Sequence, residues 1–113
     1  MNPTTVKRPW GSFTTFAENE KCTVKLLYVS QGEEFSLQYH DNRDEFWKVM
    51  KGNPDVTIGD KVESAHEGDE FFVERGTNHR VSAPDDDVII LEVSTGEFDE
   101  NDIVRLEDKY NRV

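Results

Sequence analysis

Residues 36–47 read SLQYHDNRDEFW and place an amide, an imidazole and a carboxylate close together, at Gln38, His40 and Glu45. Side chains alternate between the two faces of a β-strand, so Gln38 and His40 point the same way. Glu45 follows across a turn, at the start of the next apolar run. We therefore predict that three ligand-type side chains converge on one polar face of a sheet.

A fourth ligand is expected from residues 68–81, which read GDEFFVERGTNHRV. His79 follows a turn at Gly76 and opens a new strand in this segment. That arrangement would bring a second imidazole in from a neighbouring part of the same sheet or barrel. His66 lies beside another turn, is not part of this set of ligand-type residues, and is expected to be an exposed loop residue.

The rest of the chain consists of short runs rich in Val, Ile, Phe and Thr, separated by turn residues. Helical spacing is almost absent, so the pattern predicts an all-β fold, either a sandwich or a small barrel. The predicted strands cover residues 11–16, 23–29, 35–40, 46–51, 55–58, 61–65, 70–73, 79–82 and 88–93. The Gly59-Asp60 pair predicts a tight hairpin between two of them.

The C-terminal segment GEFDENDIVRLEDKYNRV has a different character. Asp99 or Asn101 is expected to cap a short helical turn over residues 102–105. Four apolar residues of this segment need burial, so the tail is predicted to pack back on the barrel. These residues are Ile103, Val104, Leu106 and Tyr110.

Composition limits the possible partners. The 113 residues are expected to form one domain over 1–113, and 24 acidic against 13 basic residues give a net charge of -11. This charge argues against nucleic acid or an anionic membrane surface as a partner. It favours high solubility, and a salt-tolerant origin would fit it as well.

The only cysteine, Cys22, excludes an intramolecular disulfide. No apolar stretch has the length of a bilayer span, and the first residues carry no apolar targeting segment. A cytoplasmic location is the resulting expectation.

The spacing of the ligand-type residues resembles the two motifs of the cupin superfamily. The first motif is matched by Gly32-x5-Gln38-x-His40-x4-Glu45-x6-Gly52, and the second by Gly68-x5-Glu74-x-Gly76-x2-His79. Gln38 stands where the first motif most often has a histidine, Glu74 where the second usually has proline, and Ala83 where it often has asparagine. The resemblance implies a cupin fold, an RmlC-like double-stranded β-helix.

Further phrases narrow this resemblance to the cupin-type (type II) mannose-6-phosphate isomerases. RPWGSF, FSLQYH, RDEFW, GTNHR, LEVSTGEF and NDIVRLEDKYNR follow one another as in that family, including the isomerase domain of bifunctional enzymes that also carry a mannose-1-phosphate guanylyltransferase. The resemblance implies interconversion of mannose 6-phosphate and fructose 6-phosphate through an enediol. It also implies one divalent metal ion bound by Gln38, His40, Glu45 and His79. Zinc is the first expectation, and manganese, cobalt, nickel and iron(II) suit the same mixed N/O ligands.

Catalytic and substrate-binding residues are expected among the charged residues near these ligands. Arg105 and Lys25 resemble residues of the isomerase family and are expected to bind the phosphate and assist catalysis, with Arg43 as a further substrate-binding residue. Arg80 alternates away from the face of His79 and is expected at the surface. Glu92 lies amid apolar residues, where an unpaired carboxylate is costly, so it is either a proton-transfer group or an outward-facing strand residue.

Trp47 and Trp10 are expected to pack in the core or a lid. Two other functions fit the same sequence: a non-catalytic cupin that binds sugar or regulates a partner enzyme, and a different metal-dependent cupin enzyme such as an epimerase or an oxygenase. The expected partners are a small sugar phosphate and, by analogy with small cupins, a second copy in a homodimer.

Overall fold

The computed structural model describes residues 3–112, which form eleven β-strands and no helix within that span. The all-β prediction is confirmed. The strands are β1 (Thr4–Arg8), β2 (Gly11–Thr15), β3 (Cys22–Val29), β4 (Leu37–Tyr39), β5 (Arg43–Lys51), β6 (Asp55–Ile58), β7 (Lys61–Ser64), β8 (Glu70–Val73), β9 (His79–Ser82), β10 (Val88–Gly96) and β11 (Val104–Glu107). Each of the nine predicted strands is present, and β1 and β11 were not predicted.

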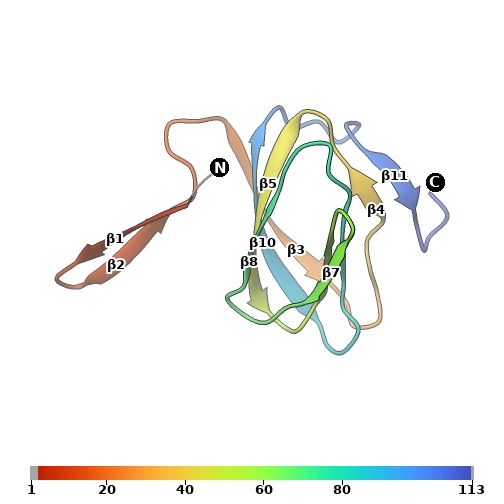
Figure 1. Cartoon of the computed structure of the whole chain (residues 1–113), viewed down its shortest axis with the longest axis horizontal. Coiled ribbons are helices and arrows are strands. Elements are labelled where there is room, and N and C mark those ends of the chain that lie inside the picture. The colour runs from red at the N-terminus through yellow and green to blue at the C-terminus, as the bar shows by residue number, and fades with distance from the viewer. Residues whose placement is uncertain (1–2, 113) are drawn as a thin grey trace.

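Two antiparallel sheets make up the body of the molecule (Figure 1). One has the strand order β3-β10-β5-β8 and the other β11-β4-β9-β6-β7. The apolar core takes Trp47 and Ile90 from the first sheet and Val56 and Val81 from the second, all almost fully buried. The two sheets therefore pack face to face, and the predicted hairpin joins β6 to β7 at Gly59-Asp60.

Within the part of the chain that the structure describes, β1 and β2 pair only with each other and form a separate hairpin. Figure 1 shows this hairpin extending away from the body, along the 51 Å long axis of the molecule. Trp10 lies at its turn and is 72% exposed, so the expectation that Trp10 packs in the core or a lid was wrong. Trp47, by contrast, is fully buried in the core.

The predicted helical turn over residues 102–105 was also wrong. Residues from Val104 onward form β11 and pair with β4. Asp102 does not begin a helix, because its carboxylate accepts hydrogen bonds from the backbone N–H groups of Asp41 (2.9 Å) and Asn42 (3.0 Å). The backbone of residues 104–107 then forms hydrogen bonds with the edge of β4.

The tail does pack back on the body, but most of its apolar side chains are not buried. Ile103 is half-buried, whereas Val104, Leu106 and Tyr110 remain exposed. Strand alternation explains this result, since the half-buried side chain between Val104 and Leu106 is Arg105. Among the described residues, no helix is long and apolar enough to cross a membrane.

Two features of the turn after β5 require glycine at position 52. Its φ of 89° is unfavourable for residues with a side chain, and a β-carbon there would overlap the carbonyl oxygen of Asp87. We predict that Gly52→Ala lowers the free energy of unfolding by about 3 kcal/mol, measured by urea denaturation. Gly32→Ala is the control: its φ is 82° but nothing lies within 4 Å of the added carbon, so about 1 kcal/mol is expected. Equal losses in the two variants would contradict the role of the overlap.

Candidate metal centre

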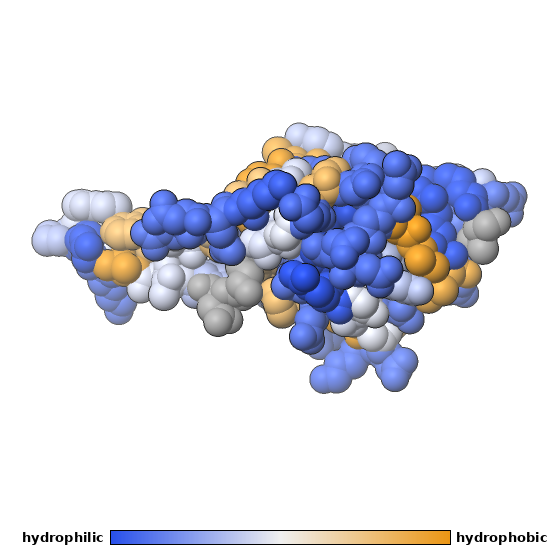
Figure 2. Space-filling model, turned by 90° about the horizontal axis from the view of Figure 1, so that it is seen from above, coloured by the Kyte–Doolittle hydropathy of each residue, from blue (hydrophilic) through white to orange (hydrophobic). Residues whose placement is uncertain are grey.

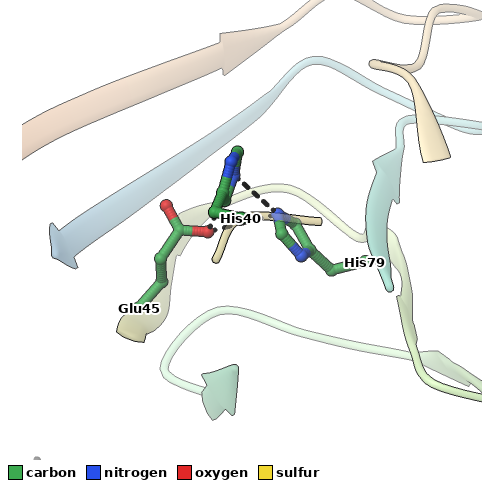
Figure 3. Close-up of side chains that lie close together, drawn as sticks. All are labelled: His40, Glu45 and His79. Carbon is green, nitrogen blue, oxygen red and sulfur yellow. Dashed lines mark hydrogen bonds and ion pairs between the residues drawn. The ribbon is translucent and has the colours of Figure 1, made fainter. Parts of the chain in front are cut away.

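Three side chains meet inside the barrel, between the two sheets (Figure 3). Glu45 lies on β5, His79 opens β9 and His40 directly follows β4; all three are buried. The Nε2 atoms of His40 and His79 are 3.2 Å apart, and the Oε1 atom of Glu45 lies 3.2 Å from His79 Nε2 and 3.6 Å from His40 Nε2. Of the predicted ligands, the structure brings these three within reach of one ion.

Backbone carbonyl groups hold both imidazole rings in place. The Nδ1 atom of His40 donates to the carbonyl oxygen of Asp102 at 2.7 Å, and Nδ1 of His79 donates to that of Thr77 at 2.9 Å. With the proton on each Nδ1, the two Nε2 atoms keep their lone pairs and face Glu45, as binding of a metal ion through Nε2 needs.

The electrostatics of the site favour binding of a cation between Glu45 and the two imidazole rings. Burial alone would raise the pKa of Glu45, but hydrogen bonding to His79 and Glu92 outweighs burial and lowers the pKa to about 2. Burial lowers the pKa of His40, which favours its neutral form. The Oε1 atom of Glu45 is buried and faces the Nε2 atoms of both imidazole rings. A buried carboxylate facing two imidazole nitrogens needs a cation, either a proton or a metal ion.

The spacing of the three donor atoms fits a divalent metal ion. Zinc binds imidazole nitrogen and carboxylate oxygen at roughly 2.0–2.2 Å, so the donors of a tetrahedral site stand roughly 3.3–3.6 Å apart. The observed separations of 3.2, 3.2 and 3.6 Å are close to these values. The residues present therefore fit a metal site without a large rearrangement.

Gln38, the fourth predicted ligand, lies next to this group. Its Cα is paired with that of His79 across β4 and β9, and directly opposed residues project to the same face of a sheet. Its Oε1 atom accepts a hydrogen bond from Ser36 Oγ at 3.1 Å. An amide oxygen has two lone pairs, so one remains for a metal ion.

Glu92 lies on the inner face of β10, not on the outer one. It is buried, Trp47 Nε1 donates to its Oε2 atom at 3.0 Å, and its Cα is paired with that of Lys25. Burial, together with the neighbouring charge of Glu45, raises the pKa of Glu92 to about 8. Glu92 is therefore an acidic group that can hold a proton beside the candidate metal site.

Basic side chains surround the same part of the barrel. Arg43 is buried, and its Nη2 atom lies 3.1 Å from His40 Nε2. Lys25 is paired with Glu100 at 3.4 Å. The ring of Phe98 contacts both cations, with its centroid 4.1 Å from Lys25 Nζ and 4.6 Å from the guanidinium carbon of Arg43.

Arg105 is paired with Gln38 across β11 and β4 and so shares its inner face. Its buried Nε atom has no hydrogen-bond partner among residues 3–112, which is costly for a guanidinium group unless a ligand completes it. Arg80, in contrast, donates to the carbonyl oxygens of Phe35 and Glu107, away from the site. His66 is exposed, as predicted.

Sequence reasoning missed Asp102, Thr77 and Phe98 as parts of this region. Asp102 and Thr77 contribute carbonyl oxygens, which every residue type has, so no sequence signal marks them. Phe98 could have been noticed as the aromatic residue of the GEFDEN segment, but only the folded chain places it against Lys25 and Arg43.

The family model and two similar curated proteins point to the same family. The family described as "Mannose-6-phosphate isomerase C-terminal" matches residues 1–108. A mannose-1-phosphate guanylyltransferase of Sinorhizobium fredii is 35% identical over 96% of this chain and 22% of its own length. The alginate biosynthesis protein AlgA of Pseudomonas aeruginosa is 36% identical over 99% of this chain and 24% of its own. The chain thus spans less than a quarter of the length of these relatives.

Solved structures support the fold independently of sequence. A protein of Klebsiella pneumoniae with a double-stranded β-helix domain superimposes with a TM-score of 0.68 at 18% identity, covering 82% of this chain and 81% of that one. The predicted double-stranded β-helix fold of the cupins is confirmed.

Proposed function

Because the chain belongs to the family of mannose-6-phosphate isomerase C-terminal domains, we propose that it is a metal-dependent isomerase that interconverts mannose 6-phosphate and fructose 6-phosphate through an enediol. The observation that carries this proposal is the convergence of His40, Glu45 and His79 next to a buried proton-carrying group, Glu92. A sugar-binding module has no need of that combination.

His40, Glu45, His79 and Gln38 would hold one divalent ion, with zinc as the first candidate. The ion would act as a Lewis acid that polarises the carbonyl group of the sugar and stabilises negative charge on its oxygen. The protein's contribution is to fix both imidazole rings through Asp102 and Thr77 and to keep the carboxylate of Glu45 ionised.

Isomerisation moves one proton between C1 and C2, and Glu92 is the proposed carrier. It lies on the inner face of the barrel, and Trp47 Nε1 fixes one carboxyl oxygen while the other stays within 3.5 Å of Ser94 Oγ. A carboxylate held in this way takes the proton from one carbon of the sugar and returns it to the neighbouring carbon.

The phosphate group needs local positive charge, because the chain as a whole is strongly acidic. Arg105 offers a buried, unpartnered Nε atom, and we propose that it binds the phosphate with Lys25. Arg43 is buried against His40 and Glu45 and would contact the sugar end of the substrate. Lys25 is 35% exposed and forms an ion pair with the exposed Glu100, so a dianion can replace that partner at little cost.

A coupled assay of fructose 6-phosphate formation tests the function. The chain is stripped with a chelator and reloaded separately with zinc, manganese, cobalt, nickel or iron(II). Turnover that a metal restores and the chelator abolishes supports the isomerase. Binding of mannose 6-phosphate without turnover under any metal would contradict it and favour the sugar-binding alternative.

The phosphate assignment predicts a KM effect. Arg105→Ala should raise KM for mannose 6-phosphate about 10- to 100-fold with a smaller change in kcat, because hydrogen bonds to a charged group contribute about 1.5–3 kcal/mol. Arg112→Ala, in the exposed tail where the arginine pairs with Asp108, is the control and should leave KM unchanged. An unaltered KM in Arg105→Ala would remove Arg105 from the phosphate site.

A further inference from the structure

The buried guanidinium group of Arg43 lies against two of the proposed metal ligands. Its Nη2 atom is 3.1 Å from His40 Nε2, and its Nε atom is 3.7 Å from Glu45 Oε2. Nε and Nη2 share one edge of the planar group, so this edge faces the donors of both ligands. Arg43 is 7% exposed, and no residue in the described part of the chain accepts a hydrogen bond from Nε. A deeply buried cation thus points an unused donor toward the metal centre.

The hydrogen bond between Arg43 and His40 occupies an atom that a metal ion needs. The His40 ring carries its proton on Nδ1, which donates to the carbonyl oxygen of Asp102. Its Nε2 atom has a single lone pair, and this lone pair accepts from Arg43 Nη2. His79 Nε2 is 3.2 Å away but cannot donate, because the proton of that ring is on Nδ1 and bonds to Thr77. One lone pair serves either an N–H donor or a metal ion, so the two partners exclude each other.

The charge of Arg43 adds to this exclusion. A guanidinium group does not lose its proton in proteins, so Arg43 is a permanent positive charge beside the buried carboxylate of Glu45. A buried carboxylate needs such a partner. A divalent ion bound to the same carboxylate would be repelled by Arg43, and a buried site screens that repulsion only weakly.

The other contacts of Arg43 do not involve the metal ligands. Its Nη1 atom donates to the carbonyl oxygen of Asp99 at 3.2 Å, and the guanidinium carbon lies 4.6 Å from the centre of the Phe98 ring. Both residues belong to the segment that follows β10. Arg43 can therefore give up the hydrogen bond to His40 and still keep an acceptor and an aromatic contact for its charge.

We infer that Arg43 is a built-in counter-cation of His40 and Glu45 that a divalent ion has to displace, so that Arg43 lowers the affinity of the site for metal. Figure 2 shows hydrophilic residues over much of the body, and the net charge of -11 attracts cations from solution. Arg43 opposes this attraction at the site itself. The inference rests on the metal site of the proposed function and does not depend on the isomerase reaction.

Zinc affinity, measured by competition with a chromophoric chelator, tests the inference. Arg43→Met replaces the charged group with an uncharged side chain and should bind zinc about 10- to 100-fold more tightly than the unaltered chain, because both the lone pair and the carboxylate are released. Arg43→Lys keeps a positive charge and should gain less. Arg8→Met is the control: it removes the same charge from an exposed residue of the β1–β2 hairpin and should leave the affinity unchanged.

Thermal unfolding of the chelator-stripped chain gives a second readout that does not use turnover. Without metal, Arg43→Met leaves Glu45 without its counter-cation and should unfold at a lower temperature than the unaltered chain. Zinc should then raise the unfolding temperature more in Arg43→Met than in the unaltered chain, because tighter binding to the folded state stabilises it more.

Two results would overturn the inference. One is zinc affinity in Arg43→Met that is equal to or weaker than in the unaltered chain, which would make Arg43 a support for Glu45. The other is an Arg43→Met chain that stays unfolded, by circular dichroism, even at saturating zinc. Failure of every chain to bind zinc would be a different result, because it would remove the metal site of the proposed function and the inference with it.

Discussion

Replacing His79 with alanine is expected to lower the affinity for a divalent metal at least about 100-fold and to remove isomerase activity. His79 Nε2 is 3.2 Å from both Glu45 Oε1 and His40 Nε2, so its loss leaves two of the three convergent donors and opens a cavity beside Trp47. Bound metal per chain, measured by elemental analysis after dialysis, is the readout.

The matched control is His66→Ala, which removes an exposed histidine outside the site and should change neither metal content nor activity. Gln38→Ala should reduce metal content less than His79→Ala, because an amide oxygen is the weakest donor of the set and here also accepts from Ser36. Thermal unfolding of each variant shows whether the chain still folds. Full metal content in a folded His79→Ala chain would refute the ligand assignment.

The ligand spacing was readable from the sequence because strand alternation is a local property. Gln38 and His40 are two residues apart on one strand, and Glu45 follows a single turn later. That His79 lies beside them depends on the pairing of β4 with β9, which periodicity alone does not determine. The cupin-like spacing of the motifs supplied that information.

Elements whose stability depends on distant partners were harder to predict. A helical turn was expected over residues 102–105, with Asp99 or Asn101 as its cap, but pairing with the edge of β4 makes Val104–Glu107 a strand. The strand β1 contains four polar or charged residues in five and no alternation of apolar ones. Its pairing with β2 is fixed by the Pro9–Gly11 turn, and its apolar side chains gain little burial within the chain.

The environment of Glu92 could be predicted only in part. The run VIILEV places a carboxylate in an apolar strand, and such a carboxylate needs a partner wherever it is buried. Which face of the sheet the Glu92 side chain points to depends on which residues of β10 alternate inward. The register between β10 and β5 shifts between Ile89 and Ile90, so this cannot be read from the sequence. The donation from Trp47 Nε1 joins residues 45 positions apart, so sequence reasoning assigned Trp47 to packing alone.

Substituting Glu92 with glutamine should lower kcat about 10²- to 10⁴-fold, the range that a positioned proton carrier contributes. Glutamine has nearly the same shape, and its amide oxygen can still accept from Trp47 Nε1, so packing around the site should persist. The amide cannot take up a proton from the sugar carbon. KM and bound metal should therefore change little, which separates this variant from His79→Ala.

The control is Glu63→Gln, which makes the same chemical change at an exposed residue of β7 and should leave kcat unaltered. Proton exchange gives an independent readout, since a working carrier passes solvent deuterium to C2 of mannose 6-phosphate or C1 of fructose 6-phosphate. Glu92→Gln should slow this wash-in of deuterium in step with kcat. A variant that keeps full turnover and full exchange would show that Glu92 serves the fold through Trp47 and that another group moves the proton.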